Sequence, residues 1–219
     1  MKNAPLYRRI LSVVLTIAML ATLLVPVVSA EPDKVEAEVI EVVPCPAEPS
    51  VAVTVLCGLP KGDRTDYIIQ KCVEAGASEI VFFLSDRCVA RPDAPEKKLE
   101  RWQRIAEEAA KQSGRGIIPQ VRWAGEFAEA LNIANQKELK IFLYETGERE
   151  GLDAVLEANK SAKSVALITG PEGGFEPFEA ELARALGFRI CSMGPRILRC
   201  ETAPLAALTA LMYATGNLS

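Results

Sequence analysis

The sequence predicts an α/β domain built on a parallel sheet that is covered by helices on both faces. Over residues 51–219, short apolar runs alternate with segments of helical spacing. The runs are continuously apolar, which is typical of strands buried on both faces. Glycine and proline turns separate the two kinds of segment. Ligands of such sheets bind beyond the carboxyl ends of the strands.

The elements follow in a regular order. Buried strands are expected at residues 51–57, 79–84, 139–144, 164–169 and 189–193, and a short strand at 119–123. Helices are expected at residues 65–75, 96–113, 126–135, 152–158 and 202–214. A further helix begins at Pro177, because Glu176 occupies a cap position and Glu179 follows three residues later, and Gly187 ends it.

The N-terminal 50 residues differ from this pattern. Residues 1–30 carry Lys2, Arg8 and Arg9 before an uncharged apolar run that ends in Val-Ser-Ala, which predicts an export signal. An uncleaved membrane anchor and a misassigned start are alternatives. Residues 31–50 contain one alternating segment, 34–43, expected to form a half-buried strand, and then a proline-rich linker. The main domain is expected at residues 51–219.

Composition narrows the chemistry. The formal net charge of −4 and the pI of about 5.2 give no basic field that would hold a polyanion, so nucleic-acid binding would need local clusters. The absence of histidine excludes His-based triads and His metal ligands. The six cysteines show no CxxC spacing, which argues against a metal site. Their apolar surroundings favour reduced, buried thiols over disulfides.

Two loops after predicted strands are candidate ligand sites. The first, GPEGGF at residues 170–175, carries three glycines, which permit close approach of the backbone. Glu172 in this loop and Glu176 and Glu179 just after it would repel phosphate and suit a cationic ligand. Alternatively, the acids complement the dipole of the following helix. The second loop, SMGPRILRCETA at residues 192–203, combines the apolar pair Ile197 and Leu198 with Arg196 and Arg199. Alternatively, the apolar pair belongs to the core and the two arginines are solvated surface groups.

These motifs carry a resemblance to a known family. GPEGGF, Leu186-Gly187-Phe188 and MGPRILRCETA resemble the ribosomal RNA small subunit methyltransferase E family, the uracil-N3 methyltransferases of 16S rRNA. The upstream segments GLPKGDR at 58–64 and KLERW at 98–102 are also similar to that family. The resemblance covers residues 34–218.

The resemblance implies a SPOUT fold, a parallel sheet with a C-terminal trefoil knot, and a homodimer that binds S-adenosylmethionine. It also implies that residues 34–43 are a remnant of an N-terminal PUA-like barrel. The implied cofactor contacts are Thr169, Gly170, Glu172, Gly174, Met193, Gly194, Ile197, Leu198, Arg199, Thr202 and Ala203. No metal is implied.

The implied reaction is methyl transfer to N3 of a uridine, which must lose its imide proton to become a good nucleophile. Arg115 or Arg199 would stabilise the developing charge on the uracil oxygens, and Glu74 or Glu172 would accept the proton. The implied substrate contacts are Lys61, Arg64, Gln70, Arg87, Gln112 and Ser113. The partner would be 16S rRNA or the small ribosomal subunit.

Two other functions remain open from the sequence. A chain with a true export signal or anchor would be an exported or membrane-bound protein that kept the fold and lost the chemistry, whereas the resemblance implies a cytoplasmic enzyme. An unrelated α/β enzyme acting on a phosphorylated ligand is the third possibility, and the acidic first loop argues against it.

Overall fold

The computed structural model describes residues 27–31, 34–91 and 94–218. Contacts divide the chain into two compact units. The smaller unit joins the N-terminal segment up to Glu48 with Ala110–Ile118, and the larger unit contains Pro49–Ala109 and Pro119–Ser219. The sequence pattern alone does not indicate that residues 110–118 belong with the N-terminal segment.

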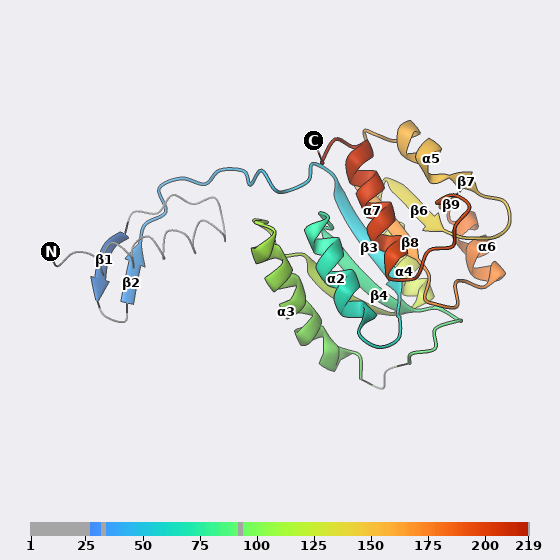
Figure 1. Cartoon of the computed structure of the whole chain (residues 1–219), viewed down its shortest axis with the longest axis horizontal. Coiled ribbons are helices and arrows are strands. Elements are labelled where there is room, and N and C mark those ends of the chain that lie inside the picture. Colours follow the sequence, from blue (N-terminus) through green and yellow to red (C-terminus); the bar gives the residue numbers. More distant parts are fainter. Residues whose placement is uncertain (1–26, 32–33, 92–93, 219) are drawn as a thin grey trace. The chain divides into compact units, whose positions relative to one another are not determined.

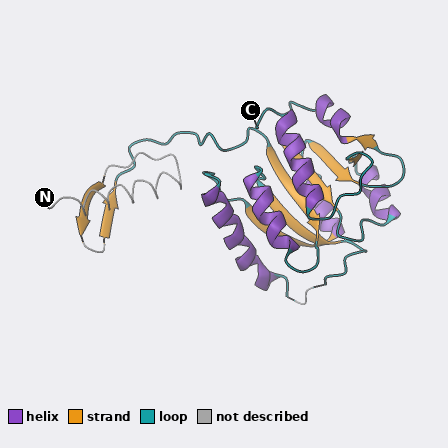
Figure 2. Cartoon of the chain, in the orientation of Figure 1, coloured by secondary structure: helices purple, strands orange, loops and turns teal. Residues whose placement is uncertain are grey.

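A sheet of seven strands forms the centre of the larger unit (Figure 2). In spatial order its strands are β5 (Gln120–Glu126), β4 (Glu79–Leu84), β3 (Ala52–Gly58), β8 (Ser164–Thr169), β6 (Leu139–Leu143), β9 (Arg189–Ser192) and β7 (Glu150–Gly151). All neighbouring pairs are parallel, which confirms the predicted sheet. β3 and β8 are central neighbours, and their continuous apolar sequences fit burial on both faces.

Helices cover both faces of this sheet. α2 (Arg64–Glu74) and α7 (Thr202–Ala214) lie side by side on the face that points toward the viewer in Figure 1. α4 (Phe127–Ala134) and α6 (Pro177–Ala185) pack against the opposite face, where they share one apolar cluster. The remaining helices are α3 (Glu96–Gln112) and α5 (Leu152–Ala158).

One aromatic side chain anchors the first candidate loop in the core. Phe175, the last residue of GPEGGF, is 1% exposed, and its ring centroid lies 4.3 Å from that of Phe142 and 5.7 Å from that of Phe127. Aromatic contacts of this kind contribute about 0.5–1.5 kcal/mol beyond the buried area. The loop therefore turns beyond the edge of the sheet, and its last residue is anchored in the hydrophobic core.

The start of α6 agrees with the sequence signals. Pro177 is its first residue, and the carboxylate of Glu179 accepts a hydrogen bond from the backbone N–H of Glu176 at 2.8 Å. A second N–H, that of Asp86, donates to the other oxygen of Glu179 at 3.1 Å. Burial raises the pKa of Glu179 above its ordinary value. This carboxylate therefore joins the loop after β4 to the beginning of α6.

The smaller unit contains an antiparallel hairpin of β1 (Val27–Glu31) and β2 (Lys34–Ala37). The strand expected over residues 34–43 thus ends at Ala37, and no strand pairs with residues 38–43 in the part of the chain that the structure describes. In the same unit Arg115, with a side chain only 3% exposed, forms an ion pair with Glu48 at 2.8 Å.

Most of the predicted signal-like segment, residues 1–26, lies outside the described residues. Among the helices that the structure describes, none has the length and apolar character needed to cross a bilayer. All six cysteines are free thiols.

Candidate functional site

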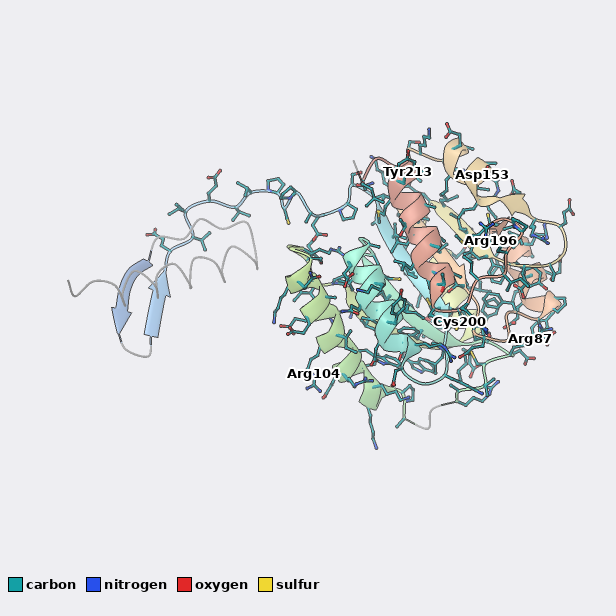
Figure 3. All side chains as sticks on the ribbon, viewed as in Figure 1. Arg87, Arg104, Asp153, Arg196, Cys200 and Tyr213 are labelled. Atoms are coloured by element: carbon teal, nitrogen blue, oxygen red, sulfur yellow. The ribbon has the colours of Figure 1, made fainter. Side chains whose placement is uncertain are left out.

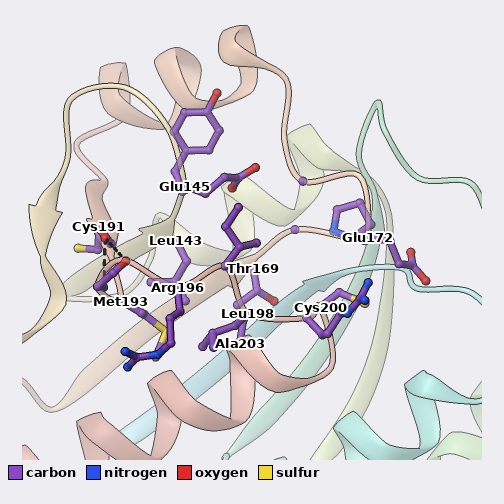
Figure 4. Close-up of a pocket in the computed structure, with 18 of the residues that line it drawn as sticks. Leu143, Glu145, Thr169, Glu172, Cys191, Met193, Arg196, Leu198, Cys200 and Ala203 are labelled. Atoms are coloured by element: carbon purple, nitrogen blue, oxygen red, sulfur yellow. Dashed lines mark hydrogen bonds between the residues drawn. The ribbon is translucent and has the colours of Figure 1, made fainter.

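A cavity of about 460 Å³ lies at the carboxyl ends of β6, β8 and β9 (Figure 4). Three loops form its walls: the one after β6, the GPEGGF loop after β8, and the MGPRILRCE segment after β9. The parallel strands place these loops together although they are separated by up to about sixty residues in the chain. In Figure 4, Thr169 stands between Glu145 on one side and Leu198 and Ala203 on the other.

The structure brings together almost all the cofactor contacts that the resemblance implies. The cavity is lined by Thr169, Gly170, Glu172, Gly174, Met193, Gly194, Ile197, Leu198, Arg199 and Ala203. Thr202, the first residue of α7, instead lines a neighbouring cavity. Ile197 is 84% exposed, so its side chain lies at the rim, whereas Thr169 at the end of β8 is buried.

The acids of the first loop have partners within the protein. Glu172 Oε1 accepts hydrogen bonds from the backbone N–H of Lys61 at 2.8 Å and from Arg64 Nη1 at 2.7 Å. Glu176 pairs with Arg87, and Glu179 accepts two backbone hydrogen bonds. The alternative interpretation, that acids complement the start of α6, therefore describes Glu176 and Glu179 best.

Arg87 holds the GPEGGF loop from outside the cavity. Its Nε donates to Glu176 Oε1 at 2.7 Å, and its Nη1 donates to the carbonyl of Gly173 at 3.2 Å. The hydrogen bond between the two side chains raises the pKa of Arg87 and lowers that of Glu176. This expected substrate contact is thus engaged with the loop that borders the cavity.

The loop after β6 supplies residues that the sequence analysis missed. Tyr144, Glu145 and Arg149 line the cavity, and Glu145 makes no hydrogen bond or ion pair with any residue that the structure describes. Gly174 has a left-handed φ of +68°, and a Cβ at this position would lie 2.5 Å from Glu145 Oε1. Glu145 lies directly after a buried strand, and this position in the sequence would have identified it as a candidate site residue.

Of the other expected residues, Arg64 also lines this cavity, and Lys61 lines the neighbouring one. Glu74 and Lys71 form an ion pair at 2.9 Å on α2, and Gln70 is exposed on the same helix. Gln112, Ser113 and Arg115 belong to the smaller unit, where Arg115 pairs with Glu48. Arg196 and Cys200 line the cavity, and Figure 3 shows Arg104 on α3, away from both of them.

The thiols at the cavity are neutral. Burial raises the pKa of Cys191 and of Cys200 to about 12, so neither is a thiolate at neutral pH. Among the described residues no group of three or more side chains is placed to hold a metal ion. The cavity therefore offers backbone groups, apolar side chains, carboxylates and guanidinium groups to a ligand.

Known proteins are similar in sequence to this chain over most of its length. The ribosomal RNA small subunit methyltransferase E of Bacillus subtilis is 37% identical over 193 residues, which cover 85% of this chain and 75% of that protein. The enzyme of the same name from Synechocystis is 38% identical over 175 residues, which cover 78% of this chain and 56% of that protein.

Solved structures and a family model agree with these relatives. The ribosomal RNA small subunit methyltransferase E from Neisseria gonorrhoeae, crystallised with S-adenosylmethionine, matches with a TM-score of 0.72 at 31% identity, over 86% of this chain and 77% of that one. Residues 47–212 match the model of the RNA methyltransferase domain. The chain therefore belongs to the RNA methyltransferase family.

Proposed function

We propose that this protein transfers the methyl group of S-adenosylmethionine to N3 of a uridine in 16S rRNA. The observation that carries the proposal is the cavity at the carboxyl ends of β6, β8 and β9, which gathers the motifs shared with the family. The relatives named above are rRNA methyltransferases, and the Neisseria protein was crystallised with this cofactor.

The residues of the cavity fit the cofactor. Its volume of about 460 Å³ lies within the ~300–1,000 Å³ typical of sites for molecules of this size. Leu143, Met193 and Leu198 offer an apolar wall, and Glu145 offers a carboxylate without a partner in the described chain to a ligand with ammonium and sulfonium charges. Gly174 leaves space beside that carboxylate.

Each wall would have a distinct task. Thr169, Gly170 and Gly174 would present backbone groups, and the segment from Met193 to Leu198 would enclose the opposite side. Glu172, Arg199 and Ala203 complete the proposed cofactor contacts in this cavity, whereas the implied contact Thr202 lines the neighbouring cavity. When bound, the cofactor supplies an electrophilic methyl group on a sulfonium.

The acceptor nitrogen needs help from the protein because its imide proton must leave. Arg199 lines the cavity, is exposed, and is placed to stabilise negative charge that develops on a uracil oxygen. Glu74 and Glu172, the two carboxylates first considered as bases, are both paired with cations.

We further propose the finer features that the family resemblance implies. The C-terminal segment would form the trefoil knot that the resemblance implies; the segment after β9 lines the same cavity as the end of β8, and α7 packs on β3 and β8. The protein would act as a homodimer in the cytoplasm, where small-subunit rRNA is found. The β1 and β2 hairpin would be a remnant of a PUA-like barrel.

Two measurements test the function with the full-length chain. Calorimetric titration with S-adenosylmethionine is expected to show binding, and incubation with 16S rRNA transcript or small subunits is expected to create a stop to reverse transcription, because an N3-methyl group blocks base pairing. Arg199→Ala should lower methyl transfer by about tenfold or more. No heat at millimolar cofactor, together with no transcription stop, would refute the proposal.

A further inference from the structure

A second cavity adjoins the proposed cofactor site. It has a volume of about 610 Å³ and lies between the loop after β3, the first turns of α2 and the start of α7. Two side chains, Arg64 and Glu201, line both cavities. Their ion pair, with 3.4 Å between Arg64 Nε and Glu201 Oε2, is therefore part of a wall that the two cavities share.

The second cavity has the features of a site for an RNA base. Tyr67, on α2, is 45% exposed and lines it, and single-stranded bases are commonly held by stacking on aromatic side chains. Lys61 also lines it, and its ammonium group makes no ion pair with any residue that the structure describes. A base on Tyr67 would thus have a cation available for its phosphate.

The pair in the shared wall matches the edge of uracil. That edge presents an oxygen acceptor on each side of the N3–H donor. A carboxylate accepts from N3–H, and an adjacent guanidinium donates to an oxygen. Arg64 is held in place by its second ion pair, with Glu172 at 2.7 Å.

Glu201 is placed to receive the proton because it lines both cavities, whereas Glu172 lines only the first. Arg64 Nε and the thiol of Cys200 both contact its Oε2, at 3.4 Å and 3.1 Å, so the other oxygen is the one that would face N3. Burial alone would raise the pKa of Glu201, but the hydrogen bond from Cys200 and the charge of Arg64 bring it below its ordinary value. The group is thus a carboxylate at neutral pH.

A third cavity borders the cofactor site on another side and is a weaker candidate. Its lining contains Glu148, Glu150 and Asp153 against the single cation Arg149, and no aromatic side chain from the described part of the chain. The acids would repel an RNA phosphate, and nothing there would stack on a base.

We propose, on the basis of the function above, that the second cavity holds the target uracil, that Glu201 accepts its N3 proton, and that Arg64 orients the base by donating to one of its two oxygens, which leaves the other oxygen for Arg199. The bond between N3 and the methyl carbon forms as the carbon–sulfur bond breaks, and the electron pair of that bond stays on sulfur. The N3 proton passes to Glu201, so the sulfonium and carboxylate charges are lost together.

The first test separates proton transfer from folding and cofactor binding. Glu201→Gln is expected to bind S-adenosylmethionine within about twofold of wild type by calorimetry, and to methylate RNA about 100-fold more slowly or worse. With RNA that contains 5-fluorouridine at the target, the difference in methylation rate between wild type and Glu201→Gln should become smaller, because the fluorine makes N3–H more acidic. Glu181→Gln, an exposed position on α6, is the control and should behave as wild type.

The second test addresses the base site. Tyr67→Ala should raise the KM for RNA about tenfold without changing cofactor affinity, and Tyr67→Phe should restore it, because a phenyl ring still stacks. Tyr213→Ala, an exposed tyrosine on α7 outside the three cavities, should have no effect.

Several outcomes would overturn the proposal. These are wild-type turnover in Glu201→Gln, loss of cofactor binding in that variant, a rate difference between wild type and that variant that stays the same with fluorinated RNA, or an unchanged KM in Tyr67→Ala. A wild-type protein that fails to bind cofactor or to methylate RNA would instead refute the proposed function, so the two failures are distinguishable.

Discussion

Arg87 and Glu176 form a two-point ion pair, with Nε and Nη2 of the guanidinium 2.7 Å and 3.0 Å from the two carboxylate oxygens. The pair joins the loop after β4 to the residue that precedes α6, and Arg87 also binds the carbonyl of Gly173. Arg87, which the resemblance implied as a substrate contact, is thus bonded to the loop that borders the proposed cofactor cavity.

Arg87→Gln should therefore weaken cofactor binding rather than RNA binding. We expect a modest loss of affinity for S-adenosylmethionine by calorimetry, no more than about fivefold, since exposed ion pairs contribute little. Arg91→Gln is the matched control, because Arg91 is exposed on the same loop and, among the described residues, donates only to the carbonyl of Asp86, at 3.4 Å. Unchanged cofactor affinity with weakened RNA binding would make Arg87 a substrate contact.

Gly174→Ala tests the space beside Glu145. The left-handed φ of +68° costs a side chain about 1 kcal/mol, and the added Cβ would also displace the Glu145 carboxylate. Cofactor affinity should fall more than tenfold. Gly125→Ala has a similar φ of +73° with nothing within 4 Å of its Cβ, so it should lower the thermal midpoint only. Equal cofactor affinities in the two variants would show that the space is not needed.

Glu179→Gln should destabilise the larger unit. Both carboxylate oxygens accept backbone N–H groups, from Glu176 and Asp86, and an amide would turn its NH₂ toward one of these donors. An unsatisfied buried group of this kind costs about 1–3 kcal/mol in the free energy of unfolding, measurable by urea denaturation. Glu181→Gln, two residues along the same helix and exposed, serves as the control. A loss no larger than that of the control would contradict the capping role.

Acid should weaken the smaller unit through Glu48. Burial raises the pKa of this carboxyl, but the hydrogen bond and charge of Arg115 outweigh burial and hold the pKa below its ordinary value of 4.5. Because the folded-state pKa is the lower one, the stabilisation is present above pH 4.5 and is lost as the pH falls below it.

The amide of Ile117, which donates to Glu48 Oε1 at 3.0 Å, provides the readout. In Glu48→Gln its protection against hydrogen exchange at neutral pH should fall by the equivalent of about 0.5–1.5 kcal/mol. The wild-type protection factor should decline below pH 4.5, whereas that of the variant should not. Glu41→Gln, exposed in the same unit, should leave both unchanged. Identical pH profiles for Glu48→Gln and wild type would contradict the assignment.

The elements predicted most accurately are those with purely local signals. The strands at residues 79–84 and 164–169 and the helices at 152–158 and 202–214 have the predicted bounds. Continuous apolar runs and helical spacing determine these elements because neighbouring residues alone establish the pattern. The two-residue strand β7 carries no such pattern, since its pairing with β9 supplies the only hydrogen bonds that define it.

The sequence by itself determined the parallel α/β class and the two glycine-bearing loops of the cavity, because buried strands and turns are both indicated by the types of residue that are adjacent in the sequence. Only the tertiary structure decided which charged side chains face the cavity. Glu172 meets Arg64 across 108 positions and Arg87 meets Glu176 across 89, whereas Glu145 is left without such a partner. These pairings depend on strand order. A charged side chain pairs with the group that the fold brings within hydrogen-bonding distance, however far apart the two residues are in the sequence.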